Sequence, residues 1–447
     1  MSSANVARTS NPARTTERQL LGLALVVVVG AYAVAALAAA GNLSTGALLY
    51  SGALIALAAI AHLAVRRLAP FADPVLLPTA FLLNGLGLVL VRRIDFAQGT
   101  RLAGAQTTWT VVGIGLFALT LLLVDDHRRL ARFRYTAGAA TLALLLLPMV
   151  PGIGQVVNGA RLWVDLGLLS FQPGELAKLT MVVFLAGYLE DKRALLSVAT
   201  TRAGPLLLPA PRHLAPVLVA ALGGVGILVV QRDLGSSLLF FGVFVAMLYI
   251  ATGRAAYPAI GLTAFLVGGA TAYAAFSHVQ LRFTIWLRPF DERLINDESY
   301  QLVQSLFALG TGGLTGTGLG LGRPQIPAAA TDAIFAVLGE ELGLLGATAT
   351  LLAFLLVVTR GYKTALIAAD EVGTLLAAGL STILALQVFV IVGGVTRLVP
   401  LTGITLPFVS YGGSSLIANY LLLALLLRIS DGAHRSARFG PAGTGRS

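Results

Sequence analysis

The stretch "QLLGLALVVVVGAYAVAALAAA", residues 19–40, contains no charged side chain and is long enough to cross a lipid bilayer as one helix. Similar runs recur along the chain of 447 residues, which is 57% hydrophobic and 11% charged. That composition is typical of an integral membrane protein rather than of two or three soluble domains. We therefore predict an all-α, polytopic membrane helix bundle. The chain has no cysteine, which excludes disulfides and thiolate metal sites.

The apolar runs predict about twelve transmembrane helices, because each one needs roughly 20 mostly apolar residues. Their approximate ranges are 19–40, 44–65, 74–91, 105–124, 136–150, 174–190, 213–230, 234–251, 257–276, 331–358, 374–396 and 408–428. The connection "QRDLGSS" (231–237) is too short for an ordinary loop, which favours a break at membrane depth.

The basic residues predict how the bundle is oriented. Arginine and lysine gather in segments such as "DDHRRLARFR" and "EDKRALL", which the positive-inside rule assigns to the cytoplasm. Both termini are then cytoplasmic, as tails 1–18 and 431–447, and the first is expected to be disordered. The net charge of +11 is explained by these segments, so no nucleic-acid partner is predicted. Two long segments, 151–173 and 277–330, are expected outside.

The first polar segment, "NGARLWVDLGLLSFQPGELAKLT" (158–180), runs from an outer loop into a helix. Pro173 suits the first turn of a helix, and Glu175 near that start suits the helix dipole. Glu175 and Lys178 are three residues apart, so they share a face and can pair. The pattern is equally consistent with an ion pair at the interface, with Arg161 as an anchor, and with a functional site inside the bundle.

A second polar feature is Asp233 in "QRDLGSS", which interrupts a hydrophobic stretch. It is typical of a buried salt bridge, of a hinge or of a cavity wall. The long outer segment then becomes very glycine-rich between residues 310 and 322. No lysine and Ser/Thr follow as in a phosphate-binding loop, which favours a flexible re-entrant loop. Asp332, Glu340 and Glu341 lie at or near the start of the next helix.

The fourth polar segment, "LVPLTGITLPFVSYGGSS" (398–415), precedes the last span and contains Ser410 and Ser414. Its prolines and glycines predict a broken backbone, which is tolerated at membrane depth only where it lines protein or a water-filled cavity. Together the segments predict an outward-facing polar cavity suited to an anionic lipid with hydroxyl groups. Glycosyl transfer with a carboxylate base and transport of such a lipid are both consistent with it. The five histidines are scattered, so no metal site is predicted.

The chain resembles the SEDS family of bacterial cell-wall polymerases, which includes RodA and FtsW. Five stretches between residues 150 and 430 carry the resemblance in family order: "NGARLWVDLGLLSFQPGELAK", "QRDLGSS", "SYQLVQSLFALGTGGLTGTGLG", "TDAIFAVLGEELG" and "LVPLTGITLPFVSYGGSS". The resemblance implies a peptidoglycan glycosyltransferase of the bacterial cytoplasmic membrane that polymerises lipid II, an undecaprenyl-diphosphate-linked substrate, during elongation or division. It also implies a class B penicillin-binding protein as partner.

The resemblance also implies site residues. The family's catalytic carboxylate follows a Trp and a Pro-aromatic pair and precedes Tyr-Gln, which matches Asp291 in "WLRPFDE". It would deprotonate the acceptor sugar hydroxyl, while Arg161, Lys178 or a divalent cation such as Mg or Mn would steady the leaving diphosphate. The residues implied to line the cavity are Arg161, Glu175, Lys178, Asp233, Gln301, Asp332, Glu340, Ser410 and Ser414.

The sequence departs from the family pattern in several places. Asp291 is followed by Glu292 instead of the usual proline, so the alignment could slip by one position onto Glu292. Family members usually have ten spans, whereas twelve are predicted here. We therefore predict two extra helices within residues 19–150, ahead of a catalytic core at 151–430, which favours a RodA-like member from an actinobacterium. A lipid II flippase and a non-catalytic scaffold for a penicillin-binding protein are the alternatives.

Overall fold

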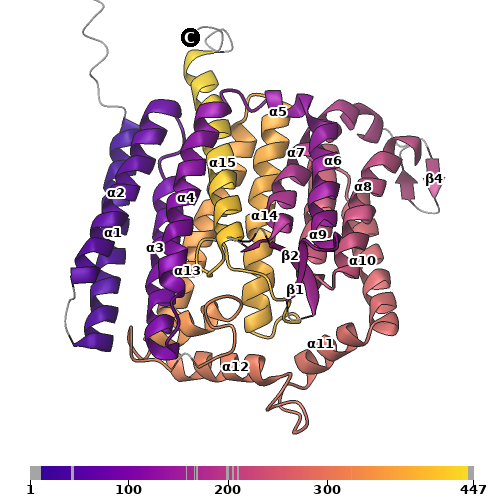
Figure 1. The fold of residues 1–447 in the computed structure, drawn as a ribbon. Coiled ribbons are helices and arrows are strands. Elements are labelled where there is room, and N and C mark those ends of the chain that lie inside the picture. Colours follow the sequence, from indigo (N-terminus) through magenta and orange to yellow (C-terminus); the bar gives the residue numbers. More distant parts are fainter. Residues whose placement is uncertain are drawn as a thin grey trace, which may run out of the picture.

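Every apolar run predicted to cross a membrane forms a helix (Figure 1). The computed structural model describes residues 12–41, 45–157, 159–165, 167, 170–197, 201–203, 206–208, 211–323 and 325–440. The twelve helices that match the predicted spans are α1 (Pro12–Ala40), α2 (Thr45–Leu68), α3 (Leu76–Gln98), α4 (Leu102–Leu123), α6 (Arg134–Leu146), α7 (Pro173–Ser197), α8 (Pro211–Val230), α9 (Leu234–Thr252), α10 (Ala256–Ala275), α13 (Ile334–Ile367), α14 (Glu371–Val395) and α15 (Gly413–Phe439).

Length and composition allow nine helices in the described part of the chain to cross a membrane: α1 to α4, α9, α10, α13, α14 and α15. The fifth predicted span is shorter than expected. Its helix α6 has 13 residues and continues as the 3-10 turn η2 (Leu147–Met149). The all-α membrane bundle is therefore confirmed.

The core of the bundle is formed by α3, α14 and α15, whose side chains are mostly buried. The two N-terminal helices lie along one edge, where α1 packs against α3 and α2 packs against α1 and α4 (Figure 1). At the other edge α10 packs against α9 and α11 and leaves most of its side chains exposed.

The bundle has two chemically different ends. The basic face contains the short helix α5 (Arg129–Arg132), the end of α15 and exposed cations such as Arg128 and Arg193. The α11–α12 face, at the bottom of Figure 1, contains α11 (Ser277–Leu287), α12 (Tyr300–Gly312) and the loop 288–299 between them. That loop projects farthest from the bundle (Figure 1).

Short strands occur in two connections where only loops were predicted. Strands β1 (Gly154–Val157), β2 (Ala160–Asp165) and β3 (Ser170–Phe171) form an antiparallel sheet between η2 and α7. Strands β4 (Thr201–Ala203) and β5 (Leu206–Leu208) form a hairpin between α7 and α8. These strands are too short to give a clear alternating pattern in the sequence.

Both predicted tails are shorter than expected. Helix α1 begins at Pro12, because Arg14 pairs with Glu17 and donates a hydrogen bond to the carbonyl of Ala72, so residues 12–18 are ordered by contacts with the bundle. Helix α15 continues to Phe439. The rest of the two tails, residues 1–11 and 441–447, lies outside the described residues. The division into domains stays a prediction.

Candidate functional site

The break predicted at "QRDLGSS" is present between α8 and α9. Arg232 has a left-handed backbone with a φ of 64°, which separates the two helices. Buried Asp233 caps α9, because its Oδ1 accepts a hydrogen bond from the backbone N–H of Ser236 at 2.9 Å. A small cavity of about 10 Å³ lies beside Asp233 and Gly174. The break thus brings a carboxylate next to the start of α7.

The predicted pair at the start of α7 is formed and buried. Lys178 Nζ lies 2.7 Å from Glu175 Oε2 and donates a hydrogen bond to Gln387 Oε1 on α14 at 3.0 Å. Gln387 Nε2 in turn donates to the carbonyl oxygen of Thr405 at 2.9 Å. Sequence reasoning missed Gln387, although an isolated amide in the apolar segment 374–396 is a usable signal.

The segment 398–412 is non-helical, as predicted, and two serines hold it in place. Ser410 Oγ accepts a hydrogen bond from the N–H of Leu406 at 2.9 Å and donates to the carbonyl of Thr331 at 2.6 Å. Ser414 Oγ accepts from the N–H of Gln172 at 2.9 Å. Ser410 therefore ties this segment to the turn before α13, and Ser414 ties the first turn of α15, which follows the segment, to the residue before α7.

Arg282 on α11 lies close to two carboxylates, Asp233 and Asp332. Its guanidinium donates a hydrogen bond to the carbonyl of Leu401 at 2.5 Å and attracts Asp233 and Asp332 electrostatically. Burial raises the pKa of Asp332 to about 6, against the opposing effects of the Thr331 hydroxyl and of Arg282. Glu175, Lys178, Asp233, Arg282 and Asp332 are named the recessed cluster below.

Asp291 lies apart from the recessed cluster, in the projecting loop 288–299. Its Oδ1 accepts a hydrogen bond from the N–H of Arg293 at 3.0 Å, and within the described part of the chain it takes part in no ion pair. The loop is anchored at the end of α11, where Trp286 Nε1 donates to the carbonyl of Arg397 at 3.1 Å and Arg397 Nε donates to the carbonyl of Trp286 at 2.8 Å. Glu292, the next residue in the loop, is exposed to solvent.

The other predicted residues lie on three further elements. Arg161 is exposed on β2, and Gln301, in the first turn of α12, has a buried Nε2 without a protein partner among the described residues. Glu340 is buried on α13, and its Oε1 accepts a hydrogen bond from the N–H of Arg323 at 3.0 Å. Glu340 thus has a contact within the protein, and the assignment of all these residues to a substrate site stays a prediction.

A divalent cation was considered for the leaving diphosphate. In the described ranges no three carboxylate, histidine or cysteine side chains come together as they would around a metal ion.

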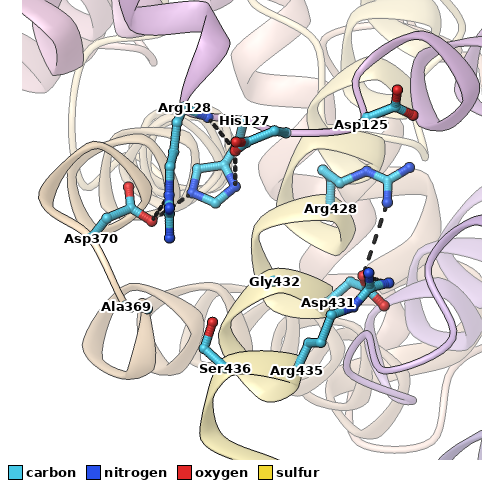
Figure 2. Close-up of a pocket in the computed structure, with 11 residues that line it drawn as sticks. Asp125, His127, Arg128, Ala369, Asp370, Arg428, Asp431, Gly432, Arg435 and Ser436 are labelled. Carbon is cyan, nitrogen blue, oxygen red and sulfur yellow. Dashed lines mark hydrogen bonds and ion pairs between the residues drawn. The ribbon is translucent and has the colours of Figure 1, made fainter. Parts of the chain in front are cut away.

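A second charged cluster, missed by sequence reasoning, lies on the basic face around a cavity of about 120 Å³ (Figure 2). Asp370 Oδ2 lies 3.0 Å from His127 Nε2 and 3.1 Å from Arg128 Nε, and Asp431 Oδ2 lies 3.0 Å from Arg435. Burial would raise the pKa of Asp370, but hydrogen bonds from His127, Gly373 and Arg128 outweigh it and hold the pKa well below its usual range.

Comparison with known proteins identifies the family. The family model for FtsW, RodA and SpoVE, described as "Cell cycle protein", matches residues 73–435. The chain belongs to the FtsW/RodA/SpoVE family. The peptidoglycan glycosyltransferase RodA of Mycobacterium tuberculosis is 48% identical over 400 residues, covering 88% of this chain and 85% of that protein. The same enzyme of Mycobacterium leprae is 44% identical over 438 residues, covering 96% and 93%.

A solved structure also shares the fold of the FtsW/RodA/SpoVE family. It belongs to a peptidoglycan synthase complex that coordinates polymerization and crosslinking, and it matches with a TM-score of 0.65 at 28% identity. The match covers 98% of that chain but 81% of this one. Since the family model begins at residue 73, α1 and α2 precede the common region. The predicted family, and its RodA-like actinobacterial type, are confirmed.

Proposed function

We propose that the protein is a peptidoglycan glycosyltransferase that polymerises lipid II at the α11–α12 face, with Asp291 as the general base. The observation that carries the proposal is the 48% identity over 400 residues to a curated peptidoglycan glycosyltransferase RodA. Because the similarity covers 88% of this chain, it favours the same activity over a different one. The broken backbone and recessed cluster on the α11–α12 face support it chemically, because polar groups at membrane depth occur where a substrate or water enters.

The proposed reaction needs one base and a stabilised leaving group. The carboxylate of Asp291 removes the proton from the acceptor sugar hydroxyl, and that oxygen forms a bond to the anomeric carbon of the donor. The bond between this carbon and the lipid diphosphate breaks with inversion, and the diphosphate keeps the electron pair. Asp291 is suited to the role because it takes part in no ion pair within the described residues, so its charge remains available.

The leaving diphosphate needs positive charge that is not already neutralised. In the recessed cluster, Lys178 is paired with Glu175 and Arg282 is attracted to two carboxylates. Arg161 on β2 and Arg288 in the loop 288–299 are exposed and, within the described part of the chain, form no ion pair. We therefore assign the diphosphate to these two arginines and the orientation of the sugars to the recessed cluster.

The proposed topology places the basic face in the cytoplasm and both termini on that side. Because the chain has no cysteine, single substitutions report it directly. An impermeant thiol reagent added to intact cells should label Glu298→Cys on the α11–α12 face and not Ala437→Cys on the basic face. The reverse pattern would contradict the proposed orientation.

The proposed partner is a class B penicillin-binding protein, which would crosslink the strands that this protein polymerises during elongation or division. The support is the related peptidoglycan synthase complex, in which polymerization and crosslinking are coordinated.

The decisive assay uses the purified full chain, lipid II and a gel that resolves glycan strands, with and without the penicillin-binding protein. Wild type and Glu292→Gln should form strands, whereas Asp291→Asn should form none while eluting and melting like wild type. Loss in Glu292→Gln with activity in Asp291→Asn would move the base by one position. Movement of labelled lipid II across vesicles without any strands would replace the polymerase by a flippase.

A further inference from the structure

We propose that α1, one of the two helices that precede the common family region, positions the glycine-rich loop 313–323 and, through it, α12 and the loop that carries Asp291. The inference rests on the proposed function for its activity test. It assigns Ala38 and Gly320 as positioning residues. The alternative is that α1 merely widens the bundle.

Helix α1 is fixed firmly enough to serve as a support. A β-carbon on Gly85 of α3 would lie 2.4 Å from Val28 Cγ2, so the absence of one lets α1 lie directly against α3. Tyr32 of α1 stacks on Tyr50 of α2, with ring centroids 4.4 Å apart. Both contacts lie well inside the helix, so they define where its C-terminal end is.

That end of α1 touches the glycine-rich loop. A β-carbon on Gly320 would lie 2.6 Å from the Cβ of Ala38 and 3.4 Å from the carbonyl oxygen of Ala35. Gly320 also has a φ of 86°, which favours glycine. The loop therefore lies directly against Ala38, and a side chain at position 320 would push the loop and α1 apart.

The same loop is held on its other sides by α13 and α3. The N–H of Gly320 donates to Glu341 Oε2 at 2.9 Å, and the N–H of Thr317 donates to the carbonyl of Glu340 at 2.9 Å. Arg93 of α3 lies 3.0 Å from Glu341 Oε1 and donates to the carbonyl of Gly322 at 2.8 Å. With α1, the loop is therefore enclosed by three helices, and the contact with Ala38 is the one that the common family region does not supply.

The loop is continuous with the elements that carry the proposed base. It follows α12 directly, and α12 in turn packs closely on α13, since a β-carbon on Gly312 would lie 2.0 Å from the carbonyl of Gly339. The other end of α12, at Tyr300, follows the loop 288–299 that contains Asp291. A shift of the glycine-rich loop therefore moves α12 as one body and displaces Asp291. Small displacements of a reacting group lower reaction rates strongly.

The test is a double-variant cycle at the contact. Gly320→Ala should lower kcat about tenfold, in line with a small misplacement, and leave KM for lipid II within about twofold. Ala38→Gly removes the atom that the new β-carbon meets, so adding it to Gly320→Ala should restore kcat about threefold or more. Val34→Gly is the control, because it also places a glycine in α1 but on its exposed side, away from Gly320, and should restore nothing.

Hydrogen exchange at residues 313–323 gives a readout that does not depend on activity. Gly320→Ala should speed exchange in this loop, and Ala38→Gly, but not Val34→Gly, should slow it again. The inference would be overturned if Ala38→Gly changed the polymerisation rate and the hydrogen exchange by the same factor in wild type and in Gly320→Ala. A wild type that forms no strands would overturn the proposed function instead, and the exchange cycle would still decide whether α1 supports the loop.

Discussion

The recessed cluster and the charged cluster on the basic face both bring carboxylates next to cations, but they differ in their electrostatics. On the basic face, Asp370 accepts hydrogen bonds from His127, Arg128 and a backbone N–H, and its pKa is lowered (Figure 2). In the recessed cluster, burial dominates and the pKa of Asp332 is raised to about 6. The shift of Asp370 is that of a carboxylate stabilised by hydrogen bonds and cations, whereas the shift of Asp332 is that of a buried carboxylate whose charge is only partly compensated.

The backbone beneath the two clusters differs in the same sense. On the basic face, ion pairs connect the ends of regular helices. Such a pair needs only two opposite charges within contact distance. The recessed cluster is built on interrupted backbone, at the break before α9 and in the segment 398–412. Phe408 in this segment and Arg397 just before it have positive φ angles. Such strain is retained where the surrounding structure fixes it, and it concentrates at functional sites.

The largest difference between the clusters is expected from substitutions at opposite ends of α7. Lys178→Ala leaves Glu175 buried without its cation and should lower the polymerisation rate about 100-fold or more. Arg193→Ala removes an exposed ion pair with Glu371 on the basic face and should leave the rate within about twofold. Strand formation per folded molecule checks both, and equal effects would remove the distinction between the two ends.

A smaller effect is expected when the anchor of the loop 288–299 is weakened. Arg397→Ala removes the hydrogen bonds to the carbonyls of Trp286 and Leu287, which lie 2.8 and 2.9 Å away. The end of α11 should then be less fixed, so kcat should fall about tenfold with little change in KM. Steady-state kinetics with lipid II test this, and a change in KM alone would show that Arg397 binds substrate instead.

The pH dependence should distinguish Asp332 from Asp370. Because the pKa of Asp332 in the folded protein is about 6, its carboxylate forms only as pH rises through that value, and polymerisation should rise with it. Asp332→Asn should abolish this part of the pH profile. Ionisation of Asp332 has the opposite effect on stability. The protonated form stabilises the fold, and this contribution is lost as pH rises through about 6. A profile unchanged by Asp332→Asn would contradict a role for this group.

The smallest effect on activity is expected from Asp370→Asn. The lowered pKa of Asp370 means that its ionised form stabilises the fold above the usual pKa of aspartate and that this contribution is lost as pH falls. The substitution should therefore lower the free energy of unfolding by about 1–3 kcal/mol, while the rate per folded molecule stays near wild type. Thermal unfolding in detergent measures the first quantity, and a rate loss in fully folded protein would contradict the structural role.

Much of the fold could be predicted because hydropathy reports membrane helices directly. All twelve predicted spans are helices, and the pairing of Glu175 with Lys178 follows from their spacing on one helix face. The strands β1 to β3 could not be predicted, since such short segments are defined by their pairing partners rather than by their own sequence.

The site was less predictable, because its contacts join distant parts of the chain. The hydrogen bond from Ser410 to Thr331 and that from Lys178 to Gln387 depend on how the helices pack. The pair of His127 and Asp370 is separated by 243 positions, and nothing in either local sequence indicates it. The proposed role of Asp291 as general base rests on the resemblance to the SEDS family, because its surroundings in the loop do not by themselves distinguish it from Glu292.

The most direct test of the account compares the rate of glycan strand formation by Asp291→Asn with that by Asp370→Asn, in preparations matched for folded protein. The account predicts no strands from Asp291→Asn and a rate within about twofold of wild type from Asp370→Asn. Strands from the first variant would contradict Asp291 as the base, and their loss in the second would contradict a purely structural role for the cluster on the basic face.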